Sequence, residues 1–359
     1  MTLTVASIFS GIGGIELGLE KAGYKTIYQC EILETARSVL NKNFDVDKLD
    51  TDITEIKSIP PTDIVAAGFP CQDLSQAGNK VGIRGHNSSL VDNMFDLILK
   101  NKKQSPQWIM LENVPFMLQL HRGRAMKHLA HRFDTLGMKW AYRVVDARAF
   151  GLPQRRRRVI VLASREHDPC DVLFSDESEY QTCFEGPAEA YGFYWTEGNT
   201  GLGWTVDGVP TLKGGSGLGI PCPPAIWLKK NNEIVTPHIQ DAERLQGFPA
   251  KWTQPVEEYS TSNSRWKLVG NAVAVPIAKW VGTCLQKNKG FNHRTSFELS
   301  KNTKWPNAGW GYKDKSYGVE ISEWPKCYTY HSLPEFLRYT PKALSNRCLL
   351  YTSPSPRDS

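Results

Sequence analysis

The chain has 359 residues, of which 40% are hydrophobic and 22% are charged. This composition is typical of a globular protein with one large domain or two. No uninterrupted apolar run is long enough to cross a bilayer, and the first residues lack the basic segment of a signal peptide. We therefore expect a cytoplasmic protein in a reducing environment. The eight cysteines are scattered without a CxxC pair, which predicts neither a zinc site nor a disulfide framework.

The net charge of +6 is unevenly distributed along the chain. The stretch from His121 to Arg158 holds 11 Lys and Arg residues against two Asp, a local balance of +9. A solvated helix face accounts for part of such a stretch. A density this one-sided, ending in four consecutive arginines, also favours binding to a phosphate backbone.

Apolar runs of strand length alternate with helical segments from Thr2 to about Ser164. We expect strands at Leu3–Phe9, Thr26–Cys30, Ile64–Ala67, Trp108–Leu111 and Val159–Ala163, and helices at Gly14–Ala22, Leu33–Phe44, Leu90–Lys100 and Gly123–Leu136. This alternation predicts an α/β fold with a mostly parallel, doubly wound sheet. Ligands of such sheets bind beyond the carboxyl ends of the strands.

The amino-acid composition of the sequence changes after about residue 165. Gly, Pro and Trp become frequent and helical periodicity fades, which predicts a smaller, loop-rich lobe over residues 166–263. A helix at Val275–Leu285 then returns to the first domain, so residues 1–165 and 264–290 form one unit. Residues 291–347 are an extension without an assigned role. Residues 348–359 read as a translated sequencing adapter, with a disordered Ser/Pro tail as the alternative, and are excluded from the fold.

Three groups of polar residues follow or precede predicted strands. Cys71, in the run Gly68–Gln72, lies at the mouth of a short buried strand, although a lone cysteine is often a small core residue. Glu112 ends the strand at Trp108–Leu111, where a half-buried carboxyl has a raised pKa; a helix cap or a surface acid is the alternative. Strand alternation makes Arg156 and Arg158 project together, with Arg155 and Arg157 on the other side.

A glycine-rich turn, Phe9–Gly14, joins the first strand to the first helix. Glycines there let the backbone approach a ligand closely. The turn is not a dinucleotide fingerprint, because Glu16 takes the place of the third glycine and would repel a pyrophosphate. A nucleoside without phosphates fits better, with Glu31 at its ribose hydroxyls and Asp52-Ile53 at its base.

These motifs resemble those of the DNA (cytosine-5)-methyltransferases that depend on S-adenosylmethionine. FSGIGG, GFPCQ, ENV, QRRRR, RLQGFP (Arg244–Pro249) and GNAVAVP (Gly270–Pro276) stand in the order of that family, over residues 3–285. The resemblance implies a Rossmann-like class I methyltransferase core with a smaller, loop-rich target-recognition lobe. It implies methyl transfer to carbon 5 of cytosine, at a specific short sequence of double-stranded DNA.

The resemblance also implies roles for individual residues. Cys71 would attack carbon 6 of a flipped cytosine, Glu112 would act at ring nitrogen 3, and Arg158, with Arg156 beside it, would bind the oxygen at position 2. The cofactor would be bound by Phe9, Ser10, Gly11, Gly13, Gly14, Glu31, Ile32, Asp52, Ile53, Gly68, Pro70, Asn271 and Ala272. DNA would be bound by Gln72, Ser75, Arg84, Arg155 and Arg244. The chemistry needs no metal.

The sequence departs from the family pattern at Gln240, where arginine is usual, and at Ala272, where serine is common. The extension after Gly290 has no place in the minimal pattern. Three alternatives remain. A transfer-RNA cytosine-5 methyltransferase is disfavoured because no Cys-Phe-Thr signature is present, and a nicotinamide-dependent oxidoreductase is disfavoured by Glu16. The third alternative is a catalytically silent DNA-binding relative. The expected partners are duplex DNA and a cognate restriction endonuclease encoded nearby, with a monomeric enzyme associated with the nucleoid and no membrane contact.

Overall fold

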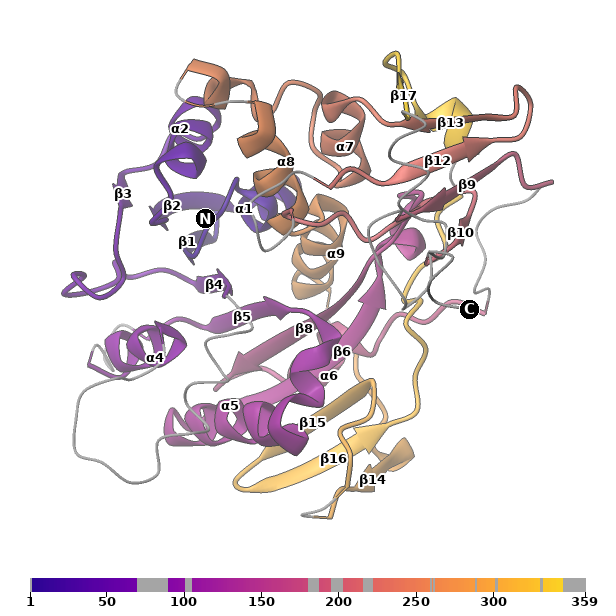
Figure 1. Cartoon of the computed structure of the whole chain (residues 1–359). Helices are drawn as coiled ribbons and strands as arrows, with labels where there is room; N and C mark the ends of the chain where they lie inside the picture. Colours follow the sequence, from indigo (N-terminus) through magenta and orange to yellow (C-terminus); the bar gives the residue numbers. More distant parts are fainter. Residues whose placement is uncertain are drawn as a thin grey trace.

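The computed structural model has a large sheet flanked by helices and a second, smaller sheet (Figure 1). It describes residues 2–69, 90–100, 105–179, 187–194, 203–215, 222–258, 260, 262–287, 289–300, 303–329 and 332–344. The large sheet has ten strands in the order β14-β16-β15-β6-β8-β5-β4-β1-β2-β3. Its strands are β1 Thr4–Ile8, β2 Lys25–Cys30, β3 Lys48–Asp50, β4 Ile64–Gly68, β5 Trp108–Asn113, β6 Lys139–Asp146, β8 Arg157–Ser164, β14 Ser296–Glu298, β15 Ala308–Tyr312 and β16 Lys315–Val319.

The large sheet is mixed. Neighbouring strands from β3 to β5 pair in parallel, as strand–helix alternation predicts. β8 enters between β5 and β6 in the opposite direction and pairs antiparallel with both. The predicted α/β class I fold is confirmed, and its antiparallel half includes β6, which the sequence analysis did not identify as a strand.

Helices cover both faces of the large sheet. α4 (Leu90–Lys100) and α5 (Arg124–Thr135) pack through apolar stripes on one face. α1 (Gly14–Glu20), α6 (Pro169–Leu173) and α9 (Val275–Leu285) pack on the other. Since parallel strands leave both faces of a sheet apolar, coverage on both sides is what buries them. The carboxyl ends of β1 to β5 remain at one open edge.

The second sheet belongs to the smaller lobe, at the upper right of Figure 1. It contains β9 (Ala190–Phe193), β10 (Thr205–Val206), β12 (Ala225–Leu228), β13 (Glu233–Thr236) and β17 (Lys342–Ala343). Two further helices, α7 (Ile239–Leu245) and α8 (Ser262–Asn271), share an apolar core with α2 (Glu34–Asn43). β7 (Gln154–Arg155) and β11 (Val209–Pro210) form a short parallel ladder that connects the two lobes.

The C-terminal extension adds strands to both sheets. β15 pairs with β6 at the edge of the large sheet, while β17 pairs with β13 in the smaller one. Between them, α10 (Leu333–Phe336) packs into the core that α7 and α8 share. The extension therefore contacts both lobes, because its hydrogen-bonded strands lie in each.

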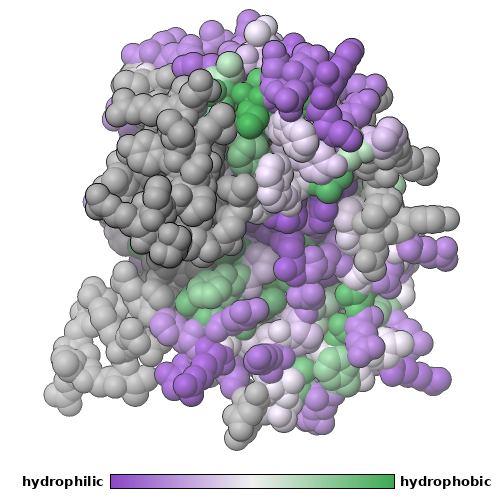
Figure 2. All heavy atoms as spheres, turned by 45° about the vertical axis from the view of Figure 1, so that its right-hand side comes forward, coloured by the Kyte–Doolittle hydropathy of each residue, from purple (hydrophilic) through white to green (hydrophobic). Residues whose placement is uncertain are grey.

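Among the described residues one apolar segment, Ser264–Leu285, is long enough to cross a membrane, but 72% of its most apolar 18-residue window is buried inside the fold. It consists of two helices, α8 and α9, separated by a break before Pro276. The break and the burial indicate two core helices of the fold. Cys327 forms a disulfide bond that the scattered cysteine spacing did not predict. The surface in Figure 2 is mainly hydrophilic where it is coloured, with small separate hydrophobic patches.

Candidate active site

Glu112 and Arg158 form a buried ion pair at the open edge of the sheet. Glu112 lies near the end of β5, and Arg158 lies near the start of the antiparallel β8, so the two side chains meet. Arg158 Nε is 2.8 Å from Glu112 Oε1, and the two residues are 8% and 7% exposed. Burial raises the pKa of Glu112, and the positive charges of Arg158 and Arg156 oppose that rise without cancelling it. The site therefore holds a carboxyl that takes up a proton more readily than a surface glutamate.

The chain that leads to Cys71 lies next to this pair. Gly68, the last residue of β4, is in register with Glu112, and a Cβ atom at Gly68 would lie 3.6 Å from Glu112 Oε2. Asn113 Nδ2 donates a 2.9 Å hydrogen bond to the carbonyl of Phe69. Asn113 thus fixes the backbone two residues before Cys71, a role that the sequence analysis missed although Asn113 directly follows Glu112. Pro70, Cys71, Gln72, Ser75 and Arg84 lie outside the described residues.

Arg156 is buried beside the Glu112–Arg158 pair, but its guanidinium binds backbone carbonyls and not a carboxylate. It donates hydrogen bonds to three backbone carbonyls, those of Leu212 (3.1 Å), Gly270 (3.0 Å) and Ala272 (2.6 Å). The predicted alternation holds, since Arg156 and Arg158 are buried whereas Arg157 is exposed and Arg155 is partly exposed. These bonds hold the turn at Gly270–Ala272, whereas Arg156 Nε has no partner among the described residues, so the catalytic role of Arg156 stays a prediction.

The glycine-rich turn after β1 has the strained backbone that close approach to a ligand requires. Phe9, Gly11 and Gly13 have positive φ angles of 58°, 56° and 85°. The Glu31 carboxylate accepts hydrogen bonds from the amides of Gly11 (2.7 Å) and Leu33 (2.8 Å). Glu31 therefore ties the turn after β1 to the end of β2, while Ser10 is buried beneath the turn.

The other predicted cofactor residues lie around the same edge. Asp52 follows β3 and accepts hydrogen bonds from the backbone and side chain of Thr54, each 2.8 Å long. Ile53 is buried, whereas Ile32 is 65% exposed. A Cβ atom at Gly14 would lie 2.2 Å from the carbonyl oxygen of Val273, so the segment that contains Asn271 and Ala272 packs directly against the start of α1.

The comparison with known proteins agrees with this geometry. Over residues 3–188 the sequence matches the family of C-5 cytosine-specific DNA methylases. The chain belongs to this family. It is therefore a DNA (cytosine-5)-methyltransferase, and the resemblance predicted from the motifs is confirmed. The transfer-RNA alternative is not favoured.

Curated relatives of this methyltransferase include type II enzymes along nearly its whole length. It is 49% identical over 356 residues to type II methyltransferase M2.BsuMI of Bacillus subtilis (strain 168), covering 97% of this chain and 91% of the relative. It is 29% identical over 302 residues to type II methyltransferase M.NlaX of Neisseria lactamica, covering 77% and 93%. The crystal structure of the S. pombe Dnmt2 methyltransferase matches with a TM-score of 0.54 and 15% identity, over 79% of this chain and 98% of that one, which supports the fold.

Two arginines of the methyltransferase that were predicted to bind DNA are engaged elsewhere. Arg155 donates to the carbonyls of Gly203 (3.0 Å) and Trp204 (3.2 Å), which fixes the loop before β10. Arg244 pairs with Asp241 at 2.6 Å and lies 4.4 Å over the Phe336 ring. Arg155 thus binds the smaller lobe, and Arg244 joins α7 to the extension, while their contacts with DNA stay a prediction.

The smaller lobe is organised by a buried ion pair that the sequence analysis did not single out. Glu243, in the RLQGFP region, accepts hydrogen bonds from Lys251, Thr253 and Arg265. Arg265 Nη2 lies 2.8 Å from the carboxylate, and both side chains are buried. The available signal was the position of Glu243, which directly precedes the RLQGFP motif and its Arg244.

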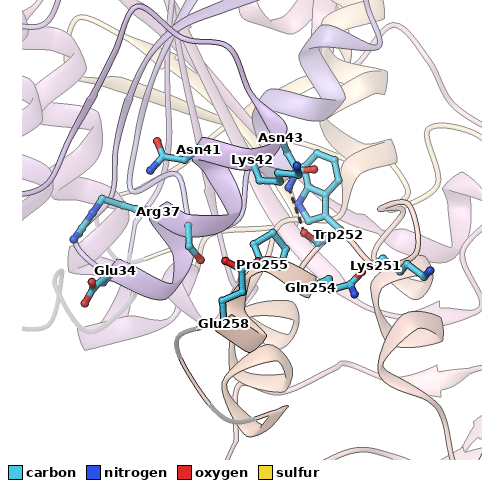
Figure 3. Close-up of a pocket in the computed structure, with 11 residues that line it drawn as sticks. Glu34, Arg37, Asn41, Lys42, Asn43, Lys251, Trp252, Gln254, Pro255 and Glu258 are labelled. Carbon is cyan, nitrogen blue, oxygen red and sulfur yellow. Dashed lines mark hydrogen bonds between the residues drawn. The ribbon is translucent and has the colours of Figure 1, made fainter.

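One hollow of the methyltransferase lies away from these groups. It has a volume of about 770 Å³ and lies between α2 and η6, a 3₁₀ turn at Gln254–Glu258 (Figure 3). None of the predicted catalytic or cofactor residues lines it. Arg37 in its wall donates to the carbonyls of Glu31 and Ile32, which links it only indirectly to the cofactor edge. Its polar helix surfaces offer no reactive group, so we do not assign the chemistry there.

Proposed function

We propose that this methyltransferase acts through a covalent bond between Cys71 and the target cytosine, with Glu112 and Arg158 holding the ring. The observation that carries the proposal is the buried Glu112–Arg158 pair, 2.8 Å apart, beside the strand that leads to Cys71. A carboxyl and a guanidinium side by side match the neighbouring nitrogen 3 and oxygen 2 of cytosine.

The steps follow from the chemistry of these groups. The Cys71 thiolate forms a bond to carbon 6, and Glu112 provides a proton or hydrogen bond at nitrogen 3 while Arg158 binds oxygen 2. Electron density then reaches carbon 5, which takes the methyl group. Water takes the proton from carbon 5, and nitrogen 3 returns its proton to Glu112. The electron pair of the broken C5–H bond re-forms the C5=C6 double bond as the sulfur–carbon 6 bond breaks and regenerates the thiolate. The raised pKa of Glu112 suits this role because a buried carboxyl holds a proton more readily than an exposed one.

S-adenosylmethionine supplies the methyl group as a sulfonium. The residues around the Phe9–Gly14 turn fit this cofactor, because the carboxylates of Glu31 and Asp52 suit ribose and base and the exposed Ile32 side chain suits an adenine face. A Cβ atom at Gly11 would meet nothing within 4 Å, which leaves room for a ligand over the turn. Gly68, Pro70, Asn271 and Ala272 would complete the pocket, and Arg156 would hold the Gly270–Ala272 turn for it.

We place the DNA between the catalytic edge and the smaller lobe. The target base lies inside the duplex, so it must flip out at a cost of a few kcal/mol, which protein–DNA contacts offset. Gln72, Ser75 and Arg84 would contact this DNA, as the sequence motifs imply. The smaller lobe would read a short sequence through groove edges.

The biological setting that we propose is a restriction–modification system in the cytoplasm. The type II relatives support it, since their names place them in such systems. We expect a monomer whose methylation protects DNA from a cognate restriction endonuclease.

The test is methyl transfer from labelled S-adenosylmethionine to duplex DNA, followed by bisulfite sequencing to locate the modified cytosine. Cys71→Ser is expected to abolish transfer and Glu112→Gln to lower turnover by about 10²–10⁴-fold with cofactor affinity unchanged. Glu298→Gln, at an exposed glutamate, is the matched control. Duplex binding without any transfer by the wild-type protein would instead indicate a catalytically silent relative.

A further inference from the structure

Most basic side chains between His121 and Arg158 bind other residues of the protein. Arg143 is fully buried and donates to the carbonyls of Ser322, Leu173 and Asp176. Four others are neutralised by acids, in the pairs Arg132–Asp96, Lys139–Asp168, Arg148–Asp146 and Arg157–Glu323. Arg155, Arg156 and Arg158 are engaged in the contacts already described. The local net charge of +9 in this stretch therefore overstates the positive charge that it presents to a ligand in solution.

Arg122 and Arg124 are the exception. Both are exposed, and within the described part of the chain neither guanidinium has a hydrogen-bond or ion-pair partner. No acidic residue stands in the first turn of α5, which begins at Arg124. These two positive charges are therefore available to an anion from solution.

Arg122 lies in a strained turn, and Arg124 directly follows it. His121 and Arg122 adopt left-handed conformations (φ/ψ of 50°/42° and 59°/39°), and Gly123 follows at 80°/8°. Left-handed backbone is unfavourable for residues other than glycine, so consecutive residues hold it only where neighbouring structure imposes it. Such strain concentrates at ligand-binding sites.

The C-terminal extension imposes this conformation. Trp305 Nε1 donates a 3.0 Å hydrogen bond to the carbonyl of Gly123. A Cβ atom at Gly123 would lie 2.7 Å from the Trp305 ring, so the turn and the indole are in direct contact. The indole is itself held edge-on by Trp140 and Tyr142 of β6. The shape of the basic turn therefore depends on the extension.

The turn lies on the chain that leaves the catalytic edge. Glu112, near the end of β5, lies ten residues before Arg122. Between them, η2 (Pro115–Leu118) contacts both η3 (Leu120–Gly123) and β8, the strand of Arg158. A duplex whose cytosine reaches Glu112 presents backbone phosphates around that edge. Guanidiniums bind phosphates in a bidentate manner, which suits the two free side chains.

We propose that Arg122 and Arg124 bind backbone phosphates of the substrate duplex, in a turn that Trp305 of the extension holds in its binding conformation. The proposal rests on the chain being a DNA methyltransferase and assigns part of the extension to substrate binding. These contacts carry no sequence information, so they add affinity for any duplex and position it for catalysis.

The test is the salt dependence of duplex binding by the whole protein, measured by fluorescence anisotropy between 50 and 200 mM KCl. Each phosphate contact contributes about 0.9 to the slope of log affinity against log salt, about 3.5-fold over this range. Arg122→Gln and Arg124→Gln are each expected to reduce the slope by about 0.9.

Arg294→Gln is the matched control. Arg294 is exposed and has no side-chain partner within the described residues. It follows Phe291 by three residues, and Phe291 packs on the sheet face opposite α5. The control changes the net charge by the same amount, so an equal effect from all three variants would overturn the proposal, as would an unchanged slope in both turn variants. If the wild-type protein binds no duplex at all, the assigned function fails rather than this site.

Trp305→Phe tests the part played by the extension without changing any charge. It removes the hydrogen bond to Gly123 and keeps an aromatic ring. Weaker duplex binding with a slope reduced by up to 1.8, and unchanged binding of S-adenosylhomocysteine, would support the proposal. Gly123→Ala, which places a Cβ atom against the indole, should act in the same direction. Wild-type duplex affinity and slope in both variants would show that the extension does not hold a phosphate-binding turn.

Discussion

Replacing Glu16 with glutamine should make the protein more stable at pH 8 and leave its stability almost unchanged at low pH. Glu16 lies in α1, behind the glycine-rich turn, and is only 1% exposed. Neither carboxyl oxygen has a hydrogen-bond partner of normal geometry among the described residues, although Ser7 and Ser10 lie near. Burial raises the pKa of Glu16 from 4.5 to about 7, and repulsion by Glu20 adds to the rise.

The magnitude follows from the two pKa values. Below about pH 4.5 the carboxyl is protonated in the folded and unfolded states, so it contributes nothing. Between pH 4.5 and 7 only the unfolded chain ionises freely, so stability falls as the pH rises. Above pH 7 the cost is constant, at about 3 kcal/mol for a pKa difference of this size. Glutamine keeps the shape of the side chain and cannot ionise, so it removes this cost.

The measurement is urea unfolding of the wild-type and Glu16→Gln proteins from pH 5 to pH 8. The difference in unfolding free energy should grow in favour of the variant, to about 3 kcal/mol at pH 8. Glu298→Gln, at an exposed position, should show no such trend. A difference that is constant over the pH range, or a less stable variant at pH 8, would refute the idea that Glu16 is buried without partners.

Three further substitutions test separate parts of the fold and site. Gly18→Ala places a Cβ atom 2.5 Å from that of Ala278, where α1 crosses α9, and should lower the unfolding free energy by about 1–3 kcal/mol in urea titrations. Arg156→Lys removes the planar guanidinium that reaches three carbonyls, with the loss of one to two hydrogen bonds. Calorimetric titration should therefore show cofactor affinity at least about tenfold weaker. Unchanged affinity would show that Arg156 does not support cofactor binding through the Gly270–Ala272 turn. Arg265→Met leaves the Glu243 carboxylate buried without its cation, and thermal and urea unfolding should show a loss of about 3–5 kcal/mol.

Local patterns were enough to predict much of the fold. The helices at Leu90–Lys100 and Val275–Leu285 have the predicted boundaries, because their apolar periodicity and flanking residues depend only on nearby sequence. β6 was missed, because its residues had been considered only as part of a basic stretch. The strands of the extension were also missed, since β15 and β17 exist through pairing with strands far away in the sequence.

The amino-acid sequence alone determined the family, the class of fold and the residues proposed for chemistry, because short motifs with fixed order specify these. Tertiary structure decided what each charge does. Arg155 and Arg244 fasten loops, Arg156 holds the Gly270–Ala272 turn, and Arg122 and Arg124 have no side-chain partner among the described residues. A guanidinium's role depends on which carbonyls and carboxylates the folded chain brings to it, and those partners come from segments that the sequence does not place near one another.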